Sequence, residues 1–114
     1  MKIKSGGNSI NIPVRELKTL GAKTLGLMFR NKDYDNLYFD FGYKSRHAIH
    51  SFFVFFDFLA IWLNEKNNVV SWEIVRPFNA LVQPKKPCRK LIEVPLNKKN
   101  KRILAFFVEK RRKI

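Results

Sequence analysis

The segment HSFFVFFDFLAIW, residues 50–62, constrains the fold of this chain more than any other stretch. Five phenylalanines, one tryptophan and four aliphatic residues surround a single carboxylate, Asp57. A helix that spans a membrane needs about 20 apolar residues, whereas the apolar run over residues 52–63 is shorter and contains Asp57. We therefore interpret this segment as part of a folded core rather than as an anchor, and expect no membrane partner.

The composition of the same segment favours β-structure. Phe, Val, Ile and Trp are typical of strands, and no Glu, Lys or Gln occurs in residues 50–64. One strand over 52–63 would be unusually long, so we expect a bend or bulge near Asp57, or two strands. The polar cluster NEKNN, residues 64–68, followed by the alternating VVSWEIV, residues 69–75, predicts a β-hairpin.

Further apolar alternation predicts short strands on both sides of this hairpin. They are expected at residues 10–14, 37–41, 91–96 and 103–109, with a loose helix over 17–28, a turn over 42–46 and an extended loop over 78–88. The pattern as a whole predicts a mainly β, compact single-domain barrel-like or sandwich fold of six to seven short strands with one or two short helices.

A length of 114 residues with 46% hydrophobic content suits one domain. We expect a flexible N-terminus over residues 1–8, a globular β domain over 9–109 and a basic tail over 110–114. Cys88 is the single cysteine, which excludes an internal disulfide and a cysteine-based zinc site. The polar N-terminal residues lack the apolar run of a signal peptide, so we predict a cytoplasmic protein without a metal or other cofactor.

The net charge of +14 is concentrated in the last third of the chain. Residues 85–114 hold twelve Lys and Arg against two acids, Glu93 and Glu109. Such asymmetry indicates attraction to phosphate-bearing polymers, and the sequence-independent part of RNA or DNA binding rests on this kind of charge. The alternative is a set of surface lysines that bind nothing specific.

The candidate nucleic-acid residues fall into two clusters. They are Lys85, Lys86, Arg89 and Lys90 in one loop, and Lys98, Lys99, Lys101 and Arg102 in the next turn. If strands 91–96 and 103–109 pair, the second cluster lies at the tip of a hairpin. Tyr34, Tyr38, Tyr43 or Phe78 would then offer stacking surfaces.

A second candidate site lies where the chain enters the aromatic segment, and its residues are His50, Ser51 and Asp57. His50 could orient a ligand or act as a base, or it could simply bond a neighbouring loop. Asp57 between phenylalanines must reach solvent, pair with a cation or have a raised pKa. Neighbouring residues on a strand point to opposite sides, so neither His50 with Ser51 nor His47 with His50 predicts a catalytic pair or a metal site.

Four motifs together resemble a known family. They are GLMFR (26–30), NLYFDFG (36–42), HSFFVFF (50–56) with AIWLNEKNNVV (60–70), and PKKPCRKLIEVP (84–95). The chain is similar over residues 9–96 to the archaeal branch of the uncharacterised ACR family, the domain of unknown function 192. The resemblance implies a mainly β, barrel-like domain without a known catalytic mechanism. The family's acidic position after the aromatic segment is occupied here by Leu59, and its C-terminal Gly-Asp turn is absent.

Two hypotheses of different kinds follow, and neither assigns a catalytic residue. The first is a non-enzymatic module that contacts nucleic-acid backbone through the basic C-terminal surface. The alternative is a small-ligand or enzymatic pocket around His50. A protein–protein adaptor that uses exposed aromatic rings is a third reading, which a large apolar surface patch would indicate.

Overall fold

The computed structural model describes residues 1–18 and 26–112. In these residues it has seven strands, a short 3-10 helix and one α-helix. The strands are β1 (Lys2–Ser5), β2 (Asn8–Asn11), β3 (Arg15–Glu16), β4 (Leu37–Ser45), β5 (Phe58–Leu63), β6 (Val69–Val75) and β7 (Cys88–Pro95). The helices are η1 (Lys98–Asn100) and α2 (Lys101–Arg112).

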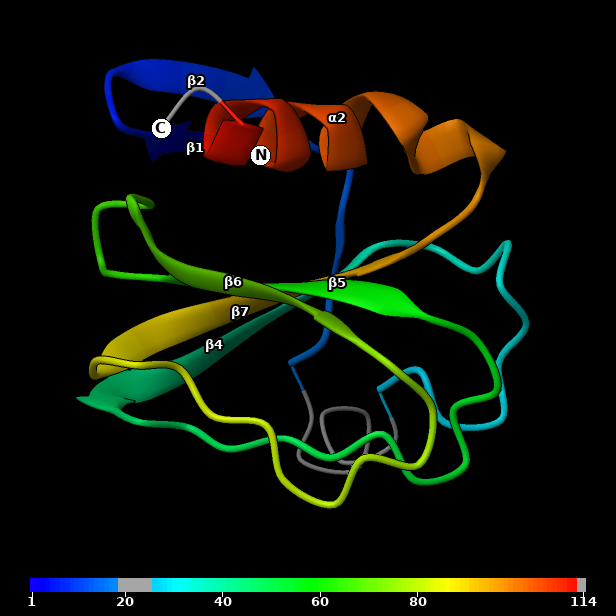
Figure 1. The fold of residues 1–114 in the computed structure, drawn as a ribbon. Helices are drawn as coiled ribbons and strands as arrows, with labels where there is room; N and C mark the ends of the chain where they lie inside the picture. The colour runs from blue at the N-terminus through cyan, green and yellow to red at the C-terminus, as the bar shows by residue number, and fades with distance from the viewer. Residues whose placement is uncertain (19–25, 113–114) are drawn as a thin grey trace.

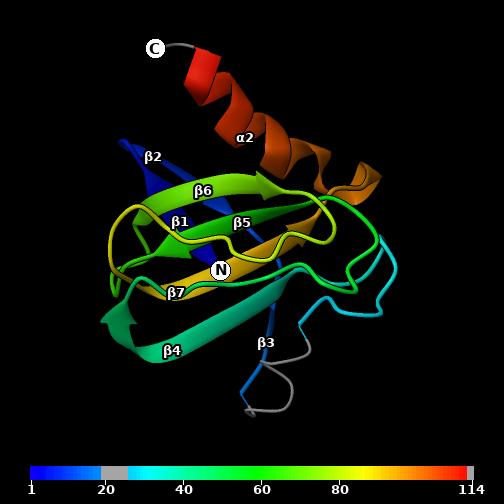
Figure 2. The same ribbon diagram turned by 60° about the horizontal axis from the view of Figure 1, so that its bottom comes forward.

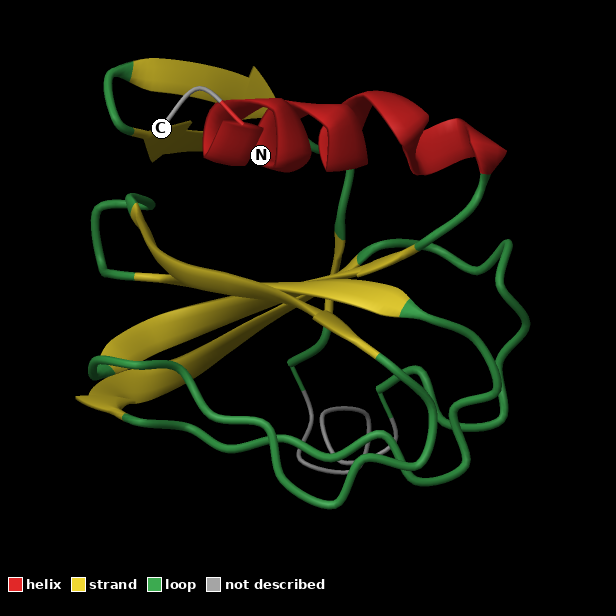
Figure 3. Cartoon of the chain, in the orientation of Figure 1, coloured by secondary structure: helices red, strands yellow, loops and turns green. Residues whose placement is uncertain are grey.

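Five strands form the main sheet in the order β3-β4-β7-β5-β6, and β1 pairs with β2 in a separate hairpin. The pairs in the main sheet are antiparallel except β3 with β4. The hairpin and α2 lie over one face of the sheet, and long loops lie over the other (Figures 1 and 3). Figure 2 shows β4, β7, β5 and β6 side by side, an open sheet with two edges rather than a closed barrel.

Strand β5 shows why the aromatic segment has no polar face. All six of its residues are fully buried. Phe58, Ala60 and Trp62 pack on the loop side, whereas its other three residues pack on the helix side. A strand that is covered on both faces is apolar at every position instead of alternating. The structure is thus a mainly β fold in sandwich-like layers, and it confirms the predicted fold class.

The predicted hairpin is confirmed by the antiparallel pairing of β5 with β6 across residues 64–68. The side chain of Asn64 accepts hydrogen bonds from the backbone N–H groups of Lys66 and Asn68. Asn67 takes a left-handed conformation with φ 64°, which Asn tolerates better than most residues.

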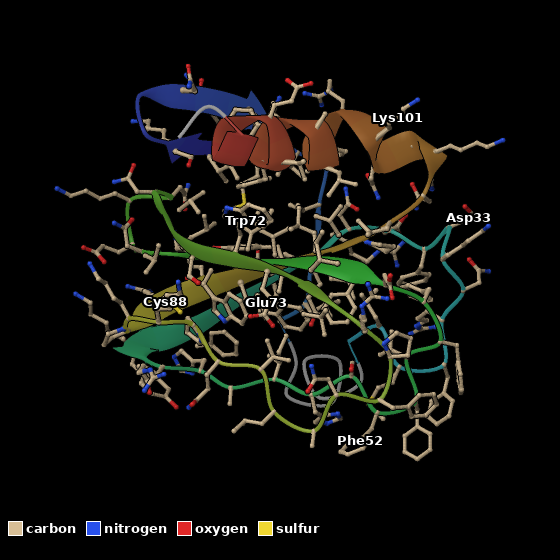
Figure 4. The ribbon with its side chains drawn as sticks, viewed as in Figure 1. Asp33, Phe52, Trp72, Glu73, Cys88 and Lys101 are labelled. Atoms are coloured by element: carbon tan, nitrogen blue, oxygen red, sulfur yellow. The ribbon has the colours of Figure 1, made fainter. Side chains whose placement is uncertain are left out.

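The predicted strand over 103–109 is wrong, because these residues belong to helix α2. Ile103 and Phe107 are four residues apart, a spacing that places two side chains on one face of a helix and also on one face of a strand. Both are buried against the helix side of the sheet, where the rings of Phe107 and Trp72 lie 5.5 Å apart. The proposed hairpin of 91–96 with 103–109 therefore does not exist. Figure 4 shows Trp72 between sheet and helix.

A buried pair of amides fixes the start of the helix. The Asn100 side chain donates hydrogen bonds to Asn36 Oδ1 at 2.9 Å and to the Pro95 carbonyl at 2.8 Å. Asn36 in turn donates to the Pro13 carbonyl at 2.9 Å. Asn97 caps the preceding 3-10 turn through its side chain. Because buried amides are costly without partners, this network sets where the chain leaves β7 and turns into α2.

The expectation for the first half of the aromatic segment is also wrong. Residues 52–57 form an irregular loop, and the strand starts only at Phe58. Phe52, Phe53 and Phe55 are exposed. Strand propensity reports residue type and not position in the fold, so it could not separate rings of the core from rings of the loop.

Three smaller expectations need revision or remain open. Residues 1–8, for which we expected no regular structure, contain β1 and the start of β2, and Ile3 is fully buried. The turn predicted over 42–46 is wrong, because β4 continues to Ser45 through an irregular pairing with β7. The helix predicted over 17–28 falls largely outside the described residues. No helix in the described part of the chain has the length and apolar character of a membrane span.

The packing of α2 gives a direct test of the revised fold. We expect Phe107→Ala to destabilise the protein by about 3–5 kcal/mol, the usual cost of truncating a buried aromatic ring. Phe106→Ala is the matched control and should cost less, because Phe106 is only partly buried. Chemical denaturation measures both. Equal losses would contradict the assigned helix face.

Candidate functional site

A cavity of about 210 Å³ lies between the sheet and the loops that cover its lower face. Most of its lining is apolar. The lining residues are Gly26, Leu27, Met28, Phe39, Phe41, Ala48, Ile49, His50, Val54, Phe58, Leu91 and Glu93. The cavity thus lies on the face of the sheet that irregular loops cover, opposite α2.

Glu93 is the acidic group in this lining. It lies at the middle of the sheet, where its backbone pairs with Leu37 on β4 and with Ala60 on β5. Its exposed fraction is only 6%. No ion pair or side-chain hydrogen bond within the described part of the chain engages its carboxyl group. Because no fully buried side-chain oxygen of the described residues lacks a partner, the Glu93 oxygens keep a little accessible surface, which we place at the cavity that Glu93 lines. A carboxyl group buried without a partner is costly, and such groups in a cleft mark candidate functional sites.

Burial raises the pKa of Glu93 from 4.5 to about 8. The cause is desolvation, which disfavours the charged carboxylate. The group is therefore mostly protonated at pH 7, and ionising it there costs about 1.4 kcal/mol. The attraction of a cation bound beside the carboxylate would be large enough to offset this free energy of ionisation.

Of the three predicted pocket residues, His50 lines the cavity and the other two do not. His50 is exposed at the rim, and its Nδ1 accepts a 3.2 Å hydrogen bond from the Phe52 backbone. Ser51 is fully buried; its Oγ donates to the Arg76 carbonyl at 2.5 Å and accepts from the Asn79 N–H at 2.7 Å. Ser51 thus joins two loops, and Asp57 lies half-buried just before β5.

The sequence reasoning missed Glu93, although a signal was present. In LIEVP, residues 91–95, a lone acid interrupts an otherwise apolar strand. The alternation of strand side chains places it on the same face as Leu91, which is buried.

The other histidine and the cysteine are held by the structure in inert roles. His47 stacks on Phe41 with 4.0 Å between ring centroids, and its Nε2 lies 2.9 Å from the Tyr43 carbonyl. Cys88 is fully buried. Burial raises the pKa of the Cys88 thiol to about 11, which keeps the thiol protonated and weakly nucleophilic at neutral pH.

A phenylalanine rim adjoins the cavity, formed by the exposed rings of Phe29, Phe52, Phe53, Phe55 and Phe78. Three loops contribute these rings, and Figure 4 shows the labelled Phe52 on the side of the sheet away from α2. The rings of Phe29 and Phe53 stack at 5.2 Å, and those of Phe55 and Phe78 meet edge to face at 5.5 Å. Their contacts with one another reduce the ring faces that are open to a partner.

The backbone of the phenylalanine rim is strained. Phe29, Phe53 and Phe78 have φ values of 62°, 61° and 59°, a left-handed conformation that bulky residues rarely adopt. Hydrogen bonds from the Phe29 N–H to the Phe53 carbonyl and from the Phe78 N–H to the Ser51 carbonyl, both 2.9 Å, hold the three loops together. The conformation of the phenylalanine rim is therefore fixed by hydrogen bonds between the loops.

The second predicted basic cluster does not lie at the tip of a hairpin, because its residues belong to η1 and the first turn of α2. An open depression at the start of α2 is lined by Lys32, Lys98, Lys99 and Lys101 together with one acid, Asp33. Figure 4 shows Lys101 and Asp33 at the same edge of the molecule. We call these four lysines and their surroundings the lysine depression. Arg102 lies on the first turn of α2 but does not line it; its side chain donates to the Asn11 carbonyl at 3.0 Å.

The first predicted cluster, Lys85, Lys86, Arg89 and Lys90, lies just before and at the start of β7. Arg89 forms an ion pair with Asp40 at 3.0 Å. The Lys90 ammonium donates to Asn67 Oδ1 at 2.8 Å and to the Glu65 carbonyl at 3.2 Å. Lys85 and Lys86 are exposed. Two of these four side chains thus bind their own protein and are less available to a polyanion.

The buried carboxyl group predicts an unusual dependence of stability on pH. The unfolded chain ionises Glu93 near pH 4.5, whereas the folded protein keeps its proton until about pH 8. Between these values the unfolded state binds fewer protons, so the free energy of unfolding falls as pH rises, by a total of roughly 3 kcal/mol at pH 7. Denaturation at pH 5 and pH 8 measures this slope.

Glu93→Gln should flatten the slope between pH 5 and pH 8 and raise stability at pH 8. Glu73→Gln is the control, because Glu73 is exposed on the edge strand β6. An unchanged slope in Glu93→Gln would show that Glu93 is not the buried acid described above.

Comparison with solved structures shows that the fold recurs. A proposed transcription regulator from Sinorhizobium meliloti 1021 superposes with a TM-score of 0.73 at 18% identity, covering 90% of this chain and 81% of that one. A protein of unknown function from Novosphingobium aromaticivorans DSM 12444 gives a TM-score of 0.72 at 13% identity, covering 89% and 74%. At these identities the likeness concerns the fold alone.

Comparison at the level of sequence gives the family. No curated protein matches the chain significantly. A family model described as Uncharacterized ACR, DUF192, matches residues 1–104. The match is to the family as a whole, so the archaeal branch stays a prediction. Because the model covers most of the chain, the protein belongs to the DUF192 family.

Proposed function

We propose that this protein is a small-ligand-binding domain, and that its site is the cavity beneath the sheet with Glu93 as the polar anchor. The observation that carries this proposal is Glu93: the residue is only 6% exposed and lines the cavity, and its carboxyl group engages no ion-pair or hydrogen-bond partner among the described residues. Ligand pockets are typically apolar with a few convergent polar groups. The proposed role is binding without catalysis.

The size and wall of the cavity suit a small organic molecule. An apolar cavity of about 150 Å³ is large enough to bind benzene, so about 210 Å³ accommodates a molecule of roughly seven heavy atoms. Phe39, Phe41 and Phe58 supply flat apolar walls, and the exposed residues Ala48 and His50 mark the opening. We therefore favour the ligand pocket over the nucleic-acid-binding module, and we centre the proposed site on Glu93 instead of His50.

A variant that closes the opening tests the proposal. We expect small probes such as benzyl alcohol to shift the NMR signals of cavity residues in the natural protein. Ala48→Trp should abolish these shifts, because Ala48 lies in the lining yet is exposed, so a larger side chain there blocks entry without disturbing the core. Ala80→Trp is the matched control, since Ala80 is exposed and outside the lining. Equal shifts in both variants, or none in the natural protein, would refute the site.

The lysine depression supports a second candidate function, the contact with RNA or DNA backbone that the charge balance predicts. Four lysines around one concave surface at the start of a helix present a locally positive field to phosphates. The charge that supports this proposal is thus centred on the start of α2, and not on the tip of a hairpin.

Salt dependence tests the second candidate. We expect binding of a single-stranded oligonucleotide whose affinity falls steeply with salt, with each lost phosphate contact reducing the log–log slope by about 0.7. Lys98→Gln with Lys101→Gln should weaken binding and reduce the slope. The control is Lys85→Gln with Lys86→Gln in the other cluster. Lys99 is left unchanged, because its ammonium donates to the Asp33 carbonyl at 2.8 Å. Equal binding by both double variants would remove the depression from consideration.

A further inference from the structure

We propose that the ligand of the cavity is a small organic ammonium cation, held by the Glu93 carboxylate and by the phenylalanine walls. This inference rests on the proposed function and specifies the chemical class of ligand. Among the described residues, neither a counter-charge nor a hydrogen-bond donor engages the Glu93 carboxyl group, which lines the cavity.

The apolar surroundings of Glu93 determine which kind of ligand group would interact most strongly with its carboxyl group. Leu37 and Ala60 flank it in the sheet, and Leu91 lies two residues before it on the same face. In such apolar surroundings an attraction between opposite charges is screened far less than in water. An ammonium ligand would supply the missing counter-charge, whereas a neutral ligand would offer the protonated carboxyl group only an ordinary hydrogen bond.

The walls add a second attraction for the same charge. Phe39, Phe41 and Phe58 all line the cavity. The face of an aromatic ring attracts a cation, and cages of such rings recognise quaternary ammonium groups. Apolar walls alone would suit many ligands, but rings together with one carboxyl group favour a positive head with short apolar substituents.

Two sources of positive charge in the protein would weaken the binding of a cation, and the experiment has to take them into account. The chain carries a net charge of +14, which lowers the concentration of cations around the protein. His50 is the only other titratable group among the described lining residues, and its protonated form would repel a cation at the opening. Glu93 and His50 therefore have to be separated by variants rather than by pH alone.

Choline and its uncharged counterpart 3,3-dimethylbutan-1-ol form a matched pair of probes, because they have the same shape and differ in the positive nitrogen. We expect choline to bind the natural protein at least tenfold more tightly than the alcohol at pH 8. Glu93→Gln should remove this preference while leaving binding of the alcohol within about threefold. Titration calorimetry or NMR titration measures all four affinities.

The pH dependence supplies a second readout. Choline remains charged throughout, and its binding must displace the proton of Glu93 below the pKa of about 8. Its affinity should therefore rise by close to tenfold per pH unit between pH 6 and pH 7.5 and level off above pH 8. The alcohol should show no such rise. His50→Gln should keep the slope for choline, and Glu93→Gln should lose it.

The outcomes separate this inference from the proposed function. Equal binding of both probes, or a choline slope that survives in Glu93→Gln, overturns the ammonium assignment but leaves a ligand-binding cavity. Binding of the alcohol alone does the same. Failure of both probes to bind at any pH, together with absence of the shifts expected for benzyl alcohol, overturns both proposals.

Discussion

The structure depends on covering both faces of one apolar sheet with few residues. Strand β5 is buried on both sides, so neither face can be left to water. The helix α2 and the hairpin of β1 with β2 cover one face by regular packing, and three long loops cover the other (Figure 3). The cavity, the buried carboxyl group and the strained rim all occur on the loop side, where the cover is least regular.

The sequence predicted an element correctly where its pattern of residues fits only one type of secondary structure. The hairpin of β5 with β6 was predictable, because alternation and an Asn-rich turn point to one structure. Helix α2 was not, since the spacing of Ile103 and Phe107 fits a helix and a strand equally and the rings favour a strand. The sequence predicted one polar residue of the candidate site, His50, because it is a polar residue beside phenylalanines. It did not predict Glu93, because the burial of Glu93 depends on the pairing of β7 between β4 and β5, which no local pattern reveals.

Charge is divided between the outside and the inside of the molecule. The surface carries a large positive excess, with one concave group of lysines at the start of α2. Among the described residues Glu93 is the one buried acid, and burial raises its pKa to about 8. These two features call for different partners, a polyanion outside and a small ligand inside, and they lie on opposite layers of the sandwich. Binding at one site therefore need not occupy the other.

The single cysteine has a practical consequence. Cys88 begins β7, is fully buried and sits in the same core that closes the loop side. A thiol in this position reacts with an electrophile only when its surroundings open. The rate at which a thiol reagent labels Cys88, the single cysteine of the chain, therefore reports how often the core around the start of β7 opens. A ligand that binds in the cavity and stabilises the closed structure is expected to lower this rate.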